Sequence, residues 1–371
     1  MKKINILFVS HEPLTAHLKK MYCIDDLKKE FKVEFLSLRT ILYGNKTDFF
    51  KFENELVGEF IDFTSIYRFY VYLKNYSKEN TYIFLESSDN HFSSIIINLL
   101  IKKYRICRFH LYGSFQSNSL LIIKRNFFEK IFFYCKNLTF LKKTIIRKLI
   151  NFNYELIFYT GNKNNFQKNK NIIHLNSSVV HKNDLETKEK NYTVFIDQGY
   201  PTHPDLLKKG YVNNEISSFI KDYNDFFSEI EKKFKTKIKI AKHPKSTIPN
   251  SLFGEREVVK GNSEELIKNS KYVIAHNSLI NNIAIINYKP IILIYSSEFE
   301  NFPNTVYIQI KSLAKTLGVD CINIESYDIN KIKFSLTKEY YDNYINKYIK
   351  VDSRENHQII KEEIIKNYNI K

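Results

Sequence analysis

Basic and polar side chains follow an apolar segment in the second half of the chain, where the sequence reads Lys242-His243-Pro244-Lys245-Ser246. Residues 237–241 before it are strand-like, and Pro244 fixes the turn that leaves His243 at the carboxyl end of the predicted strand. An imidazole there can donate a hydrogen bond to a phosphate oxygen or a nucleotide, and Lys242 and Lys245 add positive charge. This segment predicts a site for an anionic ligand.

Two more polar groups follow strand-like segments in the same half. His276-Asn277-Ser278 comes after residues 272–275 and before a helical segment, so a hydroxyl and backbone N–H groups can hold an anion there. The alternative is that Asn277 or Ser278 only caps that helix. Asp197-Gln198-Gly199 comes after residues 192–196, and its acid is either functional or part of a structural turn.

The elements that must position these groups alternate between strand-like and helix-like segments, as in parallel βαβ units. Strands are expected at residues 4–9, 33–38, 82–85, 106–111, 156–159, 192–196, 237–241, 257–260, 272–275, 290–295 and 321–324. Helices are expected at residues 14–30, 91–104, 215–234, 263–269 and 280–287 and near Leu313. The predicted fold class is α/β, with two Rossmann-like domains facing a central cleft, because such sheets bind ligands outside the carboxyl ends of their strands.

The length of 371 residues fits two domains. A polar stretch at residues 177–191 predicts the linker between a first domain at residues 1–185 and a second at residues 191–330. Residues 331–371 read as charged helices that pack back on the first domain.

Several motifs are absent from the sequence. No two of the nine glycines are spaced as GxG, which argues against a nicotinamide enzyme or a P-loop ATPase. GxSxG, HExxH and metal-type cysteine and histidine clusters are missing too, which argues against simple hydrolases and zinc sites. Without a DxD triplet, no metal and no cofactor is expected, and a positively charged site can replace a metal ion.

The net charge of +17 indicates an anionic partner, although a diffuse excess of lysine explains part of the charge. Residues 117–153 carry eight basic side chains and one acid among apolar ones. This pattern is typical of a helix on an anionic membrane surface, and equally of a core helix with a lysine face. No nucleic-acid-binding signature is present, so nucleic acid is not an expected partner.

Other features predict a cytoplasmic protein, at the inner face of the cytoplasmic membrane if the basic segment binds it. Four scattered cysteines read as free thiols in a reducing compartment. The amino-terminal apolar run ends at His11-Glu12 without a cleavage site, so we read a strand and not a signal peptide. The apolar stretch at residues 95–101 is too short to span a bilayer.

Three short motifs together resemble a known group. Phe195-Ile196-Asp197-Gln198-Gly199, Ile240-Ala241-Lys242-His243-Pro244 and Ala275-His276-Asn277-Ser278 look like the carboxy-terminal half of bacterial GT-B glycosyltransferases of the sialyltransferase and Kdo-transferase kind. In those families an HP motif and a later serine motif contact the nucleotide and phosphate of a CMP-activated acidic sugar. The resemblance, over residues 192–295, implies that donor-binding residues here are Lys242, His243, Pro244, His276, Asn277 and Ser278.

The first half departs from that pattern. Sialyltransferases of this kind carry an acidic-acidic-Gly motif whose acid is the general base, whereas the comparable strand end here reads Phe109-His110-Leu111-Tyr112-Gly113-Ser114. A transfer still needs a group that takes the proton of the acceptor hydroxyl. Glu86, after residues 82–85, is the first candidate, and His110, His11 and Glu12 are rivals. Asp197 is the candidate acid of the second domain.

The resemblance implies transfer of an acidic nonulosonic or Kdo-type sugar from CMP to a glycan or glycolipid acceptor of the bacterial surface. A neutral sugar on UDP, GDP or dTDP is the second hypothesis. The third is a non-catalytic glycan-assembly protein that binds a membrane or a partner.

Overall fold

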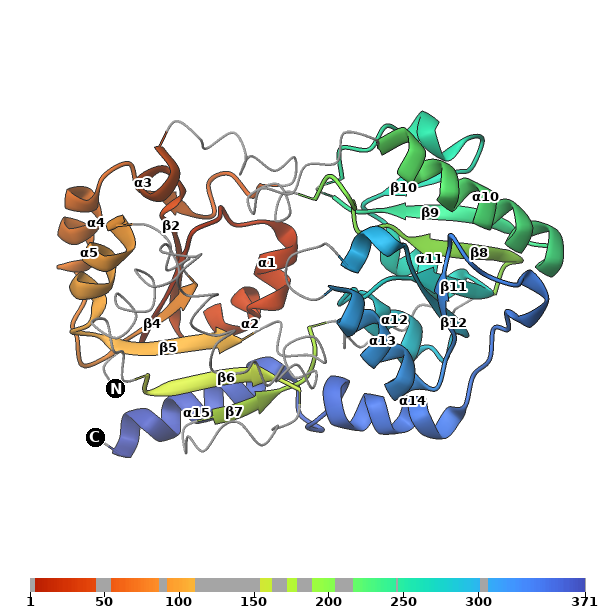
Figure 1. Ribbon diagram of the computed structural model, residues 1–371. Coiled ribbons are helices and arrows are strands. Elements are labelled where there is room, and N and C mark those ends of the chain that lie inside the picture. The colour runs from red at the N-terminus through yellow and green to blue at the C-terminus, as the bar shows by residue number, and fades with distance from the viewer. Residues whose placement is uncertain are drawn as a thin grey trace, which may run out of the picture. The chain divides into compact units, whose positions relative to one another are not determined.

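The computed structural model describes residues 4–44, 55–86, 92–110, 154–161, 172–178, 189–203, 216–244, 246–300 and 306–370. They form two compact α/β units (Figure 1). The first unit contains the described residues between 4 and 178 together with 352–370, and the second contains residues between 189 and 351. The basic segment at 117–153 and most of the expected linker lie outside the described residues.

The first unit is built around a parallel sheet with the strand order β3-β2-β1-β4-β5-β6-β7. Its strands are β1 (Asn5–Ser10), β2 (Lys32–Ser37), β3 (Ile61–Asp62), β4 (Thr81–Glu86), β5 (Arg105–His110), β6 (Leu156–Thr160) and β7 (Ile172–Leu175). The chain first adds strands on one side of β1 and then crosses to the other, so the strand order reverses between β1 and β4. This reversal is the switch point at which doubly wound sheets bind ligands. Ser10 pairs with Glu86 there.

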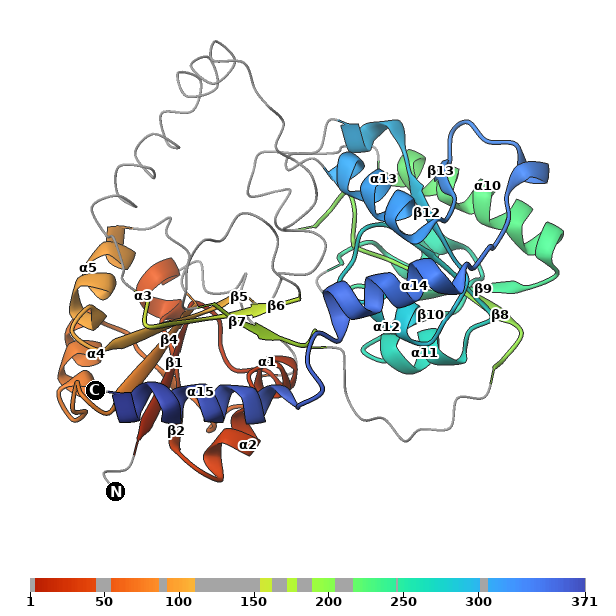
Figure 2. The same cartoon turned by 90° about the horizontal axis from the view of Figure 1, so that it is seen from below.

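Helices cover both faces of this sheet. They are α1 (Ala16–Met21), α2 (Ile24–Lys28), α3 (Arg39–Tyr43), α4 (Ile66–Leu73), α5 (Phe92–Ile101) and α15 (Asn356–Ile370). Buried side chains of α1, α2 and α15 belong to one apolar cluster, and those of α3, α4 and α5 to another. Figure 2 shows α15 beside α2, which it also contacts. The carboxy-terminal helix therefore completes one layer of the first unit.

The single helix expected at residues 14–30 is wrong. The structure divides it into α1 and α2, because α1 ends at Met21 and Cys23 then adopts a left-handed conformation with φ of 53°. At this break the Tyr22 ring packs in an aromatic cluster, where it contacts Phe8 and Phe109. No glycine or proline marked this position, so the sequence pattern continued through it.

The tail at residues 331–371 divides between the units. Helix α14 (Lys338–Tyr344) packs in the second unit, where the Tyr341 hydroxyl donates to the carbonyl of Lys289 at 3.0 Å. Only α15 packs in the first unit, with Ile360 and Ile364 fully buried and the Tyr82 hydroxyl donating to Asn367 at 2.9 Å. The chain thus returns to the first unit after residue 351 and not at residue 331.

The second unit repeats the same architecture, with the parallel strand order β10-β9-β8-β11-β12-β13. The strands are β8 (Tyr192–Ile196), β9 (Lys237–Lys242), β10 (Val258–Lys260), β11 (Tyr272–Ala275), β12 (Ile291–Tyr295) and β13 (Cys321–Asn323). The helices, besides α14, are α10 (Ile216–Phe234), α11 (Ser263–Asn269), α12 (Asn281–Ile286) and α13 (Val306–Leu317). The strand order reverses between β8 and β11, so this unit has a switch point of its own.

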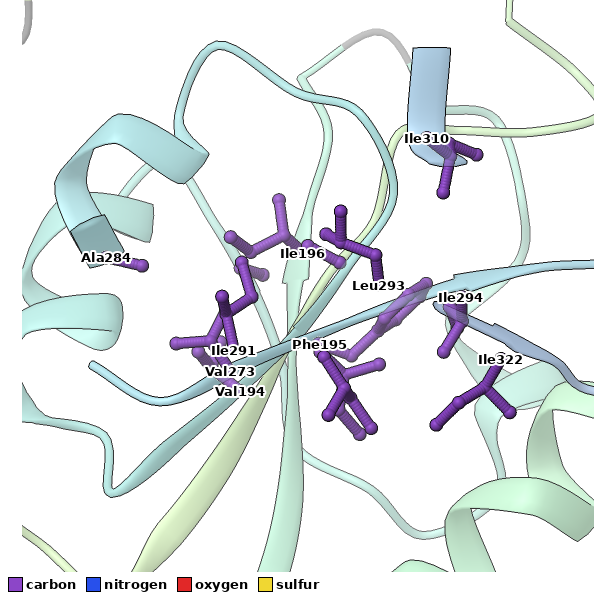
Figure 3. Close-up of a cluster of buried hydrophobic side chains, with 14 of the residues drawn as sticks. Val194, Phe195, Ile196, Val273, Ala284, Ile291, Leu293, Ile294, Ile310 and Ile322 are labelled. Carbon is purple, nitrogen blue, oxygen red and sulfur yellow. The ribbon is translucent and has the colours of Figure 1, made fainter. Parts of the chain in front are cut away.

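The core of the second unit consists almost entirely of aliphatic and aromatic side chains. Val194, Val273 and Ile291, from three neighbouring strands, are fully buried beside Ala284 of α12 (Figure 3). Strands of a parallel sheet are covered on both faces, which explains why they read as continuous apolar runs. The ends of these strands, where the apolar runs stop, carry the polar groups.

The expected class of two Rossmann-like α/β domains is confirmed. Cys23, Cys107 and Cys321 are free thiols, as expected, and Cys135 lies outside the described residues. Among the described helices, none has the length and apolar character needed to cross a membrane.

Candidate active site

The polar groups of the second unit lie in a row at the carboxyl edge of its sheet. Ile196 of β8 pairs with Ala241 of β9 on one side and with Ala275 of β11 on the other. The next residues along the three strands, Asp197, Lys242 and His276, are therefore neighbours at this edge. The structure brings together the three segments singled out in the sequence at the switch point of the second sheet.

Asp197 connects two of the three loops. Its Oδ1 accepts a hydrogen bond from the backbone N–H of Gly199 at 2.7 Å, and its Oδ2 accepts from the N–H of His243 at 3.4 Å. The side chain is 5 % exposed, and burial raises the pKa of its carboxyl, although hydrogen bonds from the Gly199 N–H, the Ser246 hydroxyl and the His243 N–H oppose that rise. Both oxygens of this candidate catalytic acid are thus engaged with the main chain.

The same two loops also touch through Gly199, which has a φ of 69° that favours glycine. A Cβ atom on Gly199 would lie 3.2 Å from Cβ of Ser246. The turn after β9 is closed by a hydrogen bond from the N–H of Ser246 to the carbonyl of His243 at 2.9 Å. These contacts hold the loops after β8 and β9 in fixed proximity.

His243 is half-buried and Pro244 exposed at this edge. The His243 ring lies 5.0 Å from the ring of His203, which follows β8, with an angle of 65° between the planes. Our sequence reasoning missed His203. It is the first residue of a second His-Pro pair, His203-Pro204, and that repetition was the available signal.

Lys242 holds the segment that follows its strand. Its ammonium donates to the carbonyl of Ile248 at 2.6 Å and to Oδ1 of Asn250 at 2.7 Å. Two of its three donors therefore hold the segment after β9, which leaves its positive charge at this edge but fixes its position.

His276 lies inside the protein, 2 % exposed. Its Nε2 shares a hydrogen bond of 2.9 Å with the Tyr223 hydroxyl, and its ring packs edge-on against Phe195, Tyr200 and Phe299. Burial lowers its pKa to about 3. The imidazole is therefore neutral at physiological pH and supports the loop from within.

Asn277 and Ser278 continue this loop. Asn277 is buried, and its Nδ2 donates to Oε1 of Gln309 at 2.8 Å, while its carbonyl accepts from Nε2 of Gln198. Helix α12 begins only at Asn281, so neither Asn277 nor Ser278 caps it. Gln198 bridges β8 to β11 across the switch point.

Several buried polar atoms at this edge have no hydrogen-bond partner among the described residues. They come from the loops after β8, β11 and β12 and from the start of α12, and they are Gln198 Oε1, His276 Nδ1, Ser296 Oγ and Asn281 Oδ1. Buried polar atoms are nearly always satisfied in proteins. Their concentration at one switch point is the strongest structural indication of a site for a polar ligand.

The first unit carries an acidic cluster at its own switch point. Glu86 accepts a hydrogen bond from the Tyr22 hydroxyl through Oε2, and its carbonyl lies 3.0 Å from Nδ1 of His11. Nε2 of His11 lies 3.7 Å from the Glu12 carboxylate. A small pocket beside Glu86 has an aromatic floor that includes Phe84. Glu86, His11 and Glu12, three of the candidate bases, are therefore close together.

His110 ends β5, next to β4, and pairs with Tyr159 of β6. Its side chain is outside the described part of the structure, so its candidacy stays a prediction. Among the described residues, no group of three or more histidine, cysteine and acidic side chains is arranged to hold a metal ion.

Comparisons with known proteins show the fold. No protein-family model and no curated protein sequence matches the chain. The chain is similar to Arabidopsis thaliana UGT89C1 complexed with UDP-L-rhamnose, with a TM-score of 0.56 and 9 % identity over 99 % of both chains. It is also similar to a putative UDP-N-acetylglucosamine 2-epimerase from Listeria monocytogenes, with a TM-score of 0.52 and 9 % identity over 100 % of this chain and 98 % of the other.

A variant of the wall teichoic acid polymerase TagF matches with a TM-score of 0.52 and 12 % identity over 100 % of this chain and 90 % of the other. These similarities extend along the whole chain. They assign it to the GT-B fold, as expected from the sequence.

The position of Asp197 leads to a prediction about stability. Replacing Asp197 with Ala should lower the free energy of unfolding by about 2 kcal/mol, because buried N–H groups lose their acceptor. Denaturant unfolding measures this, with Asp225→Ala on the exposed face of α10 as the control. An Asp197→Ala protein as stable as the wild type would contradict the conclusion that Asp197 holds the two loops together.

The burial of His276 predicts an acid sensitivity. Its folded pKa of about 3 lies below the unfolded value of 6.5, so its stabilising contribution is present above pH 6.5 and is lost as the pH falls towards 3. Between pH 6.5 and pH 5 the wild type should lose about 2 kcal/mol through this group.

The His276→Phe variant should not lose this unfolding free energy between pH 6.5 and pH 5. The His357→Phe variant, changed on α15, should lose it as the wild type does. Unfolding curves at both pH values test this, and parallel pH profiles for wild type and His276→Phe would rule the explanation out.

Proposed function

We propose that this chain is a glycosyltransferase that transfers a sugar from a nucleotide donor to a bacterial surface glycan or glycolipid. The observation that supports this most is the set of unpartnered polar atoms at the switch point of the second sheet. A nucleotide sugar has a base, a ribose and phosphates that such atoms can bind. The GT-B fold is compatible with this chemistry, and the absence of a GxGxxG motif argues against a nicotinamide ligand.

We assign donor binding to the second unit and acceptor activation to the first. In the transfer, the bond between the anomeric carbon and the phosphate oxygen breaks, a bond to the acceptor oxygen forms, and the acceptor proton goes to a base. Glu86 is the candidate base that we favour, because a hydrogen bond from the Tyr22 hydroxyl orients its carboxylate. In this assignment Asp197 acts as a brace and not as the base.

The donor we favour is a CMP-activated acidic sugar of the nonulosonic or Kdo type, on the similarity of the HP and serine motifs. A UDP-linked neutral sugar is the second candidate, and the structural similarity to a protein complexed with UDP-L-rhamnose supports including it. In either case the transfer needs no metal in this proposal.

A panel of CMP-, UDP-, GDP- and dTDP-sugars tests the proposal, with release of the nucleotide as the readout. We expect turnover of a CMP-sugar, a loss of about 100-fold or more in Glu86→Gln because the base is removed, and weaker donor binding in His243→Ala. His357→Ala, which changes a histidine of α15, is the matched control.

Turnover of only diphosphate donors would exclude the CMP assignment. Interconversion of a UDP-sugar without transfer would indicate an epimerase. If no nucleotide bound and His243→Ala kept its cellular role, the protein would be a non-catalytic assembly protein.

We also propose a peripheral contact with an anionic membrane through the basic residues at 117–153. Replacing Lys142, Lys143, Arg147 and Lys148 with Gln should release the protein from vesicles of anionic lipid, because each basic residue near such a surface contributes about 1 kcal/mol. Sedimentation with phosphatidylglycerol vesicles measures this. Binding that the four substitutions do not change would refute the contact.

A further inference from the structure

Two histidines from different loops of the second unit are in ring contact. His203 follows β8 and His243 follows β9, and their ring centroids lie 5.0 Å apart in an edge-to-face arrangement. We propose that His203 and His243 together bind one phosphate group of the nucleotide donor. This inference rests on the proposed function, and it adds a binding residue, His203, to the donor site.

The pair is held in place by the protein itself. Asp197 accepts hydrogen bonds from Gly199 on the His203 loop and from the backbone N–H of His243. The close approach of Gly199 to Ser246 adds a second connection between the loops. Because these contacts need no ligand, the two imidazoles are prearranged, and binding costs little further ordering.

The hydrogen-bond chemistry of the two imidazoles suits an anion. The Lys242 ammonium is engaged by Ile248 and Asn250, so it contributes little to a ligand directly. An imidazolium N–H donates a charge-assisted hydrogen bond to a phosphate oxygen, and a neutral imidazole still has one N–H to donate. Two imidazoles on adjacent loops can therefore contact two oxygens of the same phosphate.

Neighbouring atoms fit the same ligand. The Ser246 hydroxyl, on the loop of His243, is buried to 8 % exposure beside the Asp197 carboxylate, whose pKa its hydrogen bond lowers. Gln198 Oε1, on the loop of His203, has no hydrogen-bond partner within the described part of the chain. These atoms can donate to, or accept from, groups next to the phosphate, such as a ribose hydroxyl.

A divalent metal on the two imidazoles is the competing explanation. Among the described residues, no group of three or more histidine, cysteine and acidic side chains is arranged to hold one. Binding measured in EDTA separates the two, since a phosphate contact needs no metal and a metal bridge would be removed.

The test is a calorimetric titration of CMP and UDP, in EDTA, into the wild type, His203→Ala, His243→Ala and the double variant, with His357→Ala as control. For the nucleotide that the wild type binds, each single variant should bind about 10-fold more weakly, which is about 1.4 kcal/mol. The double variant should bind more weakly than either single one, with a loss that differs from the sum of the two, because the rings are in contact and act on one phosphate. Circular dichroism melting checks that each variant is folded.

Inorganic pyrophosphate is titrated in parallel, so that the pair is tested even if the donor nucleotide is wrong. Wild-type affinity in His203→Ala, with weakened binding in His243→Ala, would overturn the inference and leave the proposed function standing. Fully additive losses, or binding that EDTA abolishes, would overturn it too. If the wild type bound no nucleotide, the proposed function would fail, and a wild type that also failed to bind pyrophosphate would overturn the pair.

Discussion

The buried carboxylate of Asp197 is the constraint on which the candidate site depends. It comes one residue after the central strand β8, and it accepts hydrogen bonds from the backbone of both loops that carry the histidine pair. Burying a carboxylate without such donors would be costly in free energy. The buried acid therefore depends on the two N–H groups, and the loops depend on the acid for their hydrogen bonds. The glycine at 199, with its left-handed backbone, lets the loops approach closely enough for this arrangement.

The two units share one topology but differ chemically at their switch points. In the first, Glu86 and Glu12 lie among His11 and Tyr22, above an aromatic floor. In the second, neutral polar atoms and imidazoles lie around Asp197, whose buried carboxylate is bound to the main chain. This difference agrees with the proposed roles, in which the first unit takes the proton of the acceptor hydroxyl and the second binds the anionic donor.

Much of the fold could be predicted from the sequence because parallel strands buried on both faces read as uninterrupted apolar runs. The runs at 192–196 and 272–275 coincide with β8 and β11. The two-residue strand β3 was missed, since it is too short to form a pattern, and the break at Cys23 was missed because tertiary packing of Tyr22 and not local propensity determines it. Propensity is a weak guide where packing decides.

The proximity of the candidate residues was predictable, but their side-chain contacts were less so. Strand ends marked Asp197, His243 and His276 correctly as neighbours. Their individual roles depend on partners far along the chain, such as Tyr223 for His276 and Asn250 for Lys242, which the sequence alone does not reveal. His203 was overlooked because it lies seven residues beyond its strand, at a distance where strand-end reasoning no longer applies.

The most direct test of the central claim is a crystal structure of the chain with CMP bound. The account predicts that the nucleotide occupies the carboxyl edge of β8 and β11, with a phosphate oxygen within hydrogen-bonding distance of both His203 and His243, and with Asp197 still bound to Gly199. A nucleotide seated elsewhere, or one that contacts neither imidazole, would contradict it.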